Sequence, residues 1–149
     1  MTDQDYMRQA LSLAAEAAAA GDVPVGCVIV RRGEVIARGC NRREQQGDAT
    51  AHAEVEAIRA ASRALGRWHL EDCTLYVTLE PCPMCAGAIW NARIARVVYA
   101  AADARFGCCG SALHLGLEGF APWPFVTAGV CEQEAGEMLG AFFRKLRSR

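Results

Sequence analysis

The chain has 149 residues, enough for one domain of ordinary size with a buried core. Its hydrophobic content of 52% excludes a disordered chain, and its net charge of −1 gives no global sign of nucleic-acid binding. The acidic start does not resemble a signal peptide, and the apolar stretch over 10–20, interrupted by Ser12 and Glu16, is too short to span a membrane. We therefore expect a cytoplasmic protein without a membrane partner, whose eight cysteines are reduced or bind metal.

The first third of the chain predicts a helix followed by a hairpin. Apolar residues recur at helical spacing over 5–20, and Gly21 is suited to end that helix. Two apolar runs at 25–30 and 35–39 flank Arg32-Gly33, a pattern typical of two strands joined by a tight turn.

The middle of the chain predicts a loop and a second helix. Residues 41–49 are polar and are expected to form a loop. Thr50 is expected to cap a helix that ends at Gly66, and the inner face of that helix is expected to use Val55, Ile58 and Leu65.

The remaining elements alternate between strands and helices. They are a strand at 74–79, a helix opened by Pro81 and Pro83 that runs to about Asn91, a strand at 97–100, an irregular segment at 102–124 with a short helix near 112–115, a strand at 125–130 and a terminal helix at about 132–147. This order predicts a single α/β domain over 1–149, with helices on both faces of a central mixed five-stranded sheet in three α/β/α layers.

Two short segments carry a metal-binding pattern. Cys82 and Cys85 are three residues apart in the first turn of a predicted helix, so both sulfurs point the same way. A helix N-terminus favours thiolates, and His52 at the start of the other helix offers an imidazole. One His and two Cys leave one tetrahedral zinc position open, which is typical of a catalytic rather than a structural site.

Glu54 stands two residues after His52, within reach of the open position. A zinc-activated water is a nucleophile at neutral pH, and Glu54 is expected to shuttle its proton to a ring nitrogen and then to a leaving amine. The His-x-Glu and Pro-Cys-x-x-Cys pattern is that of the zinc deaminases, so it predicts hydrolytic deamination. Two alternatives stay open: a redox Cys-x-x-Cys pair, and a structural zinc closed by His69 or Cys73.

The same segments resemble the cytidine deaminase-like superfamily. Further segments are similar to its bacterial tRNA adenosine deaminase branch: Val23-Pro24-Val25-Gly26, Gly39-Cys40-Asn41-Arg42, Thr74 to Pro81, Met84 to Ala88, Asp103-Ala104-Arg105, Gly110-Ser111 and Phe142-Phe143-Arg144. The resemblance covers nearly the whole chain. It implies a cytidine deaminase-like fold, one Zn²⁺ per subunit, a homodimer, and conversion of adenosine to inosine at the wobble position (A34) of a tRNA anticodon loop that contacts both subunits.

The resemblance also implies which residues meet the RNA. Asn41 matches a residue that holds the flipped nucleotide, Ala53 supplies backbone groups at the base edge, and Asp103 approaches the neighbouring ribose. Phe143 lies on a terminal helix that meets the loop. The chain departs from the family pattern at Ala49, at Ala102 and within 121–124. These departures concern the shape of the loops and their contact with RNA, and leave the zinc ligands unchanged.

The basic charge at the end of the chain gives partial support for RNA binding. The end of the chain carries Arg144, Lys145, Arg147 and Arg149, which suits either phosphates or the C-terminal end of a helix dipole. Trp123 is expected to be the most exposed of the aromatic residues that could stack on bases. Two other functions stay open: a deaminase of a free nucleobase, nucleoside or nucleotide of the guanine or cytosine type, and a non-catalytic RNA-binding subunit with a structural zinc.

Overall fold

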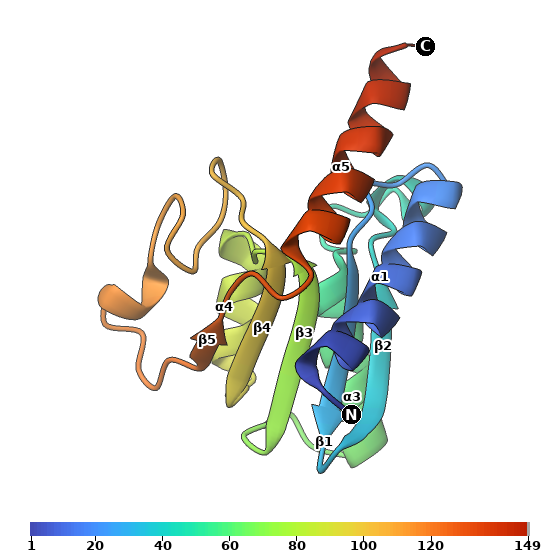
Figure 1. The fold of residues 1–149 in the computed structure, drawn as a ribbon. Helices are drawn as coiled ribbons and strands as arrows, with labels where there is room; N and C mark the ends of the chain where they lie inside the picture. The colour runs from blue at the N-terminus through green and yellow to red at the C-terminus, as the bar shows by residue number, and fades with distance from the viewer. Residues whose placement is uncertain (149) are drawn as a thin grey trace.

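The computed structural model describes residues 1–148 and shows a sheet covered by helices on both faces (Figure 1). Its elements are α1 (Asp3–Ala19), β1 (Gly26–Arg31), β2 (Glu34–Cys40), α2 (Arg43–Gln46), α3 (Ala53–Leu65), β3 (Cys73–Leu79), α4 (Pro83–Asn91), β4 (Arg96–Ala101), the 3-10 turn η1 (Leu115–Leu117), β5 (Phe125–Thr127) and α5 (Glu132–Arg147). None of the helices within residues 1–148 is both long and apolar enough to cross a membrane.

The five strands form one mixed sheet in the order β2-β1-β3-β4-β5. Strand β1 runs antiparallel to β2 and β3, whereas β3, β4 and β5 are parallel. Arg32 and Gly33 both have positive φ, which matches the twist of the β1–β2 hairpin. The predicted three-layer α/β/α class with a five-stranded sheet is confirmed.

Successive side chains of a strand point to opposite faces of the sheet, and this divides the core into two layers. Cys27 and Ile29 face α3 and α4, whereas Val28 and Val30 face α1 and α5. Figure 1 shows α1 and α5 in front of the sheet and α3 and α4 behind it. The N-termini of α3 and α4 therefore lie on one face of the sheet, next to each other.

Two local predictions in the middle of the chain were wrong. The segment 41–49 contains the short helix α2, because the buried Asp22 carboxylate accepts hydrogen bonds from the amides of Glu44 (2.7 Å) and Gln45 (3.3 Å) at its N-terminus. Thr50 does not cap α3: its hydroxyl donates to Asp48 Oδ1 at 2.8 Å, and the N-cap residue is His52.

The inner face of α3 agrees with the prediction only in part. Ile58 and Leu65 are partly buried and pack against the core, but the fully buried apolar residues of the helix are Ala53, Ala57 and Ala61, and Val55 is only partly buried. The reason is the close approach of β2: a Cβ at Gly39 would meet the Ala53 carbonyl oxygen at 2.4 Å. A helix packed this closely against a strand accepts only small side chains on that face. Gly66 ends α3 in the left-handed conformation, as expected.

Smaller differences concern the C-terminal half. The short helix lies at Leu115–Leu117 rather than near 112–115, and β5 covers only Phe125–Thr127 of the predicted 125–130. The terminal helix is confirmed with the bounds Glu132–Arg147. Arg149, part of the predicted basic end, lies outside the described residues.

Candidate metal centre and substrate pocket

Two helix N-termini present the predicted metal ligands. His52 is the N-cap residue of α3, and Cys82 is the N-cap residue of α4, with Pro83 at the first helical position. Pro at this position costs no hydrogen bond, because the first amides of a helix have no partner within it. Cys85 lies one turn into α4, so its sulfur lies on the same side as that of Cys82.

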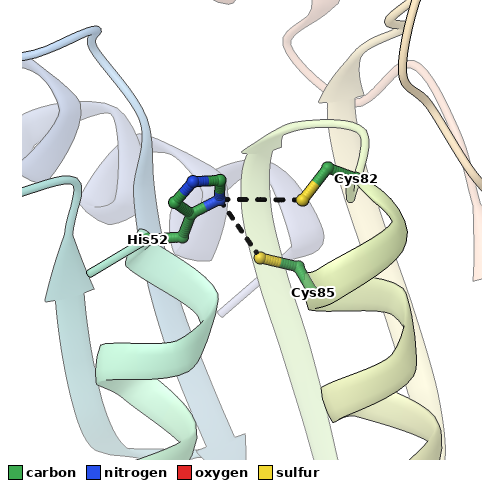
Figure 2. A group of neighbouring side chains, drawn as sticks. All are labelled: His52, Cys82 and Cys85. Carbon is green, nitrogen blue, oxygen red and sulfur yellow. Dashed lines mark hydrogen bonds between the residues drawn. The ribbon is translucent and has the colours of Figure 1, made fainter. Parts of the chain in front are cut away.

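The three side chains converge as Figure 2 shows, with both sulfurs facing one ring nitrogen of His52. His52 Nδ1 lies 3.7 Å from Cys82 Sγ and 3.5 Å from Cys85 Sγ. Tetrahedral zinc with ordinary bond lengths places nitrogen and sulfur about 3.6 Å apart. The spacing of the donors therefore fits a zinc ion, and mixed thiolate and imidazole ligands favour zinc over harder cations.

The cluster contains three donors and no fourth among residues 1–148. The two predicted candidates for a fourth ligand are engaged elsewhere: His69 lies 2.8 Å from a Glu71 carboxylate oxygen, and the Cys73 thiol donates to Asp72. A site closed by either residue is therefore not supported, and the arrangement is the open one of catalytic zinc sites.

The surroundings of the cluster favour a thiolate at Cys82, whereas the hydrogen bond to Cys82 and burial raise the pKa of Cys85. Hydrogen bonds from the Cys85 thiol and from His52 lower the pKa of Cys82 to about 4, in spite of its partial burial. The hydrogen bond to Cys82 in turn raises the pKa of His52. A thiolate is the form of cysteine that ligates a metal.

Glu54 lies beside the donors in the first turn of α3. Its side chain is only 4% exposed, and burial raises its pKa to about 7. A buried carboxylate within a pocket is the type of group that enzymes use to carry a proton near neutral pH.

A cavity of about 740 Å³ opens beside the donors. The predicted site residues Asn41, Ala53, Asp103 and Phe143 line this cavity, as do His52, Glu54 and Cys82. Cys85 lies fully buried next to them. The structure thus brings together in one place residues that the sequence separates by a hundred positions.

Hydrogen bonds fix two of the lining residues. Asn41 Nδ2 donates to the Val23 carbonyl oxygen at 3.1 Å, and its Oδ1 accepts the amide of Arg43 at 3.1 Å. Asp103 Oδ1 accepts the amides of Arg105 (3.0 Å) and Phe106 (3.1 Å). Both residues therefore shape the loops that form the pocket wall.

Glu80 is a site-shaping residue that the sequence analysis missed. The residue is 2% exposed, and its carboxylate accepts hydrogen bonds from the amides of Asp103 (3.1 Å), Cys109 (3.0 Å) and Ser111 (3.2 Å) and from the Ser111 hydroxyl. These bonds tie the loop after β4 to the strand end that precedes Cys82. The signal was a carboxylate directly after a mostly apolar strand, where burial requires partners.

The exposed aromatic residues also differ from the prediction. Trp123 is half-buried and packs near His114, so it is not the most exposed of its kind. Trp68 is 64% exposed at the far end of α3, and Phe106 is 56% exposed at the pocket. The sequence around 121–124 gave no sign that the Trp123 ring packs near Gly116 and His114.

Such a fold, with an open three-donor zinc site beside a buried carboxylate, defines the class of zinc-dependent deaminase domains. Comparisons with known proteins agree. The profile of the "cytidine and deoxycytidylate deaminase zinc-binding region" matches residues 1–101.

The tRNA-specific adenosine deaminase of Bacillus subtilis is 49% identical over 99% of this chain and 92% of its own length. A solved structure from a study of A-to-I editing by tRNA:A34 deaminases is 43% identical, with a TM-score of 0.87 over 90% of this chain and 98% of its own. The guanine deaminase of Nitrosomonas europaea is 27% identical, with a TM-score of 0.82 over 93% and 83% of the two chains. This chain therefore belongs to the tRNA-specific adenosine deaminases of the cytidine and deoxycytidylate deaminase family.

Proposed function

We propose that this protein, acting as a single-domain enzyme, hydrolyses adenosine to inosine at the wobble position (A34) of tRNA and releases ammonia. The observation that carries the chemistry is the open His52, Cys82 and Cys85 donor set, with Glu54 beside it in one pocket. The near-full-length identity to a tRNA-specific adenosine deaminase supports the substrate, since the guanine deaminase shares the fold at much lower identity.

Three residues of the site bind the metal ion, and a fourth transfers protons. His52, Cys82 and Cys85 hold one zinc ion per subunit, which when bound supplies a Lewis acid that makes water nucleophilic at neutral pH. Glu54 takes a proton from the attacking water and delivers it to a ring nitrogen of adenine. A second proton transfer through Glu54 lets the amino group leave as ammonia, and the ring retains the oxygen.

Residues around the pocket position the nucleotide. The two hydrogen bonds that Asn41 makes to the loop leave one N–H of its side-chain amide free, and this N–H would donate to the flipped nucleotide. Ala53 offers backbone groups to the base edge, Asp103 approaches the neighbouring ribose, and Phe143 contacts the loop from α5. An anticodon loop base is already unpaired, so extruding it costs little.

The partner in this proposal is a tRNA anticodon loop bound by a homodimer. The last turn of α5 carries Arg144, Lys145 and Arg147, which can neutralise phosphates. A second copy of the chain would cover exposed apolar side chains near η1, where Leu117 is 79% exposed. A cytoplasmic location agrees with eight free cysteines.

The test uses one enzyme and two kinds of substrate. The zinc-loaded protein is incubated with a tRNA transcript that carries A34 and, separately, with guanine, adenosine and cytidine, and Glu54→Ala serves as control. We expect inosine in the tRNA and little turnover of the small molecules. Turnover of a small molecule without inosine in the tRNA would assign the site to a free-base or nucleoside deaminase. A metal site with four protein ligands and no turnover would instead support a non-catalytic RNA-binding subunit.

A further inference from the structure

An exposed aromatic ring stands at the wall of the substrate pocket without a role in the chemistry. Phe106 is 56% exposed and lines the same cavity as His52 and Glu54. Exposing a phenyl ring forgoes much of the burial free energy of a large apolar side chain. A ring at this position is therefore expected to have a partner when the pocket is filled.

The loop that carries this ring is held rigidly. The amides of Phe106 and Gly107 donate to the side chain and the carbonyl of Asp103, and the buried Glu80 carboxylate accepts the amide of Asp103 itself. A Cβ at Gly107 would lie 2.4 Å from the Glu80 carboxyl carbon, so the loop is pressed against that anchor. The backbone under the ring is thus preorganised, which reduces the entropy lost when a ligand packs on it.

The charge around the ring is suited to a nucleotide. The Arg105 guanidinium carbon lies 5.1 Å from the centre of the Phe106 ring, and Arg43 lines the same cavity. Arg43 also forms an ion pair with Glu44 at 3.7 Å, and backbone amides of the loop hold the carboxylates of Asp103 and Glu80 in place. A cavity of about 740 Å³ also exceeds what a single purine base fills, and leaves room beside the target.

We propose that the Phe106 ring and the Arg105 guanidinium form a stacking subsite for the unpaired RNA base next to the target adenosine. The inference rests on the proposed function, because it assigns a contact to the flanking nucleotide of that substrate. Bases stack on aromatic rings and on guanidinium planes irrespective of sequence, and the positive charge suits the adjoining phosphate. The subsite would raise affinity for an RNA loop over a free nucleoside, and leave the proton transfers to Glu54.

The experiment measures KM and kcat on an anticodon stem-loop that carries A34. Phe106→Ala is expected to raise KM roughly 5- to 100-fold with little change in kcat, as expected for the loss of one stacked base. Phe106→Tyr should restore the wild-type KM, whereas Phe106→Leu, which keeps apolar bulk without a ring, should not. Trp68→Ala removes an equally exposed ring far from the pocket and should leave KM unchanged.

A second arm changes the substrate instead of the enzyme. On stem-loops with an abasic nucleotide on either side of position 34, the wild type and Phe106→Ala should converge to the same KM for one of the two. An unchanged KM for Phe106→Ala on the intact stem-loop, with normal inosine formation by the wild type, overturns the subsite and leaves the proposed function intact. A shift of Phe106→Ala to a smaller species in sedimentation overturns it too, because the ring would then belong to an interface between copies. No inosine from the wild type would refute the proposed function itself.

Discussion

Substitution of Gly39 by Ala tests the coupling between sheet packing and the metal site. A Cβ at this position would lie 2.4 Å from the Ala53 carbonyl oxygen and 2.8 Å from the Ala57 amide nitrogen. Both atoms belong to the α3 backbone, so no side-chain rotation relieves the clash. Restoring ordinary contact at 3.4 Å moves α3 away from β2 by up to about 1 Å.

The movement is transmitted to the metal site, because His52 is the N-cap residue of α3 whereas both sulfurs belong to α4. We expect Gly39→Ala to destabilise the fold by about 1–3 kcal/mol, a loss of about 2–12 °C in Tm. We also expect zinc affinity to fall by about 10- to 100-fold, as for other changes that reorient a ligand. Thermal unfolding and zinc competition with a chelator measure the two effects.

Gly136 provides the matched control. It is an exposed glycine within α5, and a Cβ there would meet nothing within 4 Å. Gly136→Ala should therefore stabilise the protein by about 0.5–1 kcal/mol and leave zinc affinity unchanged. If Gly39→Ala matched the wild type in both Tm and zinc affinity, the argument that close β2–α3 packing sets the position of His52 would be refuted.

Three further predictions concern chemistry, metal and pH. Glu54→Ala should keep its zinc and its Tm but lose about 10²- to 10⁴-fold in kcat, and a normal rate would remove Glu54 from the proton transfers. Removal of zinc by a chelator should lower the Tm of the wild type but not that of Cys82→Ser, as thermal scans with metal analysis would show. The free energy of unfolding lost by the wild type should reach about 4 kcal/mol if zinc was present at a thousand times its Kd before removal. Hydrogen bonds from Arg31 and Arg67 hold the pKa of Asp72 well below its usual range, so its contribution is complete above the ordinary value of 3.8 and is lost as the pH falls below it. Urea unfolding between about pH 6 and pH 3 should show a smaller loss of stability in Asp72→Asn than in the wild type.

The metal site could be predicted from sequence because its information is local. Cys82 and Cys85 are three residues apart within one helical turn, which puts both sulfurs on one face, and His52 and Glu54 stand two residues apart at the start of another helix. The element order also fixed the layers, since hydrophobic periodicity reports which faces are buried. Only the meeting of α3 with α4 required the tertiary structure, and the two helix starts were already suited to it.

The predictions that failed concern features that depend on contacts between residues distant in sequence. Helix α2 forms because the carboxylate of Asp22, some twenty residues earlier, reaches its first amides. The inner face of α3 carries small side chains because Gly39 of the neighbouring strand lies against the helix backbone. Hydrophobic periodicity alone favours the larger apolar side chains as the buried ones. Glu80 accepts hydrogen bonds from a loop that extends as far as Ser111, 31 residues later in the chain. Phe106, which is exposed, lies on that loop. Local propensity carries no information about such partners.

Formation of inosine at position 34 of a tRNA is the most direct test of the proposed activity. The zinc-loaded protein would be incubated with two otherwise identical tRNA transcripts, one with A34 and one in which the only loop adenosine is moved to a neighbouring position, and inosine would be mapped by sequencing. We expect inosine at position 34 of the first transcript, none in the second, and none with Glu54→Ala. Absence of inosine from the first transcript, in protein shown to hold one zinc per chain, would contradict that activity.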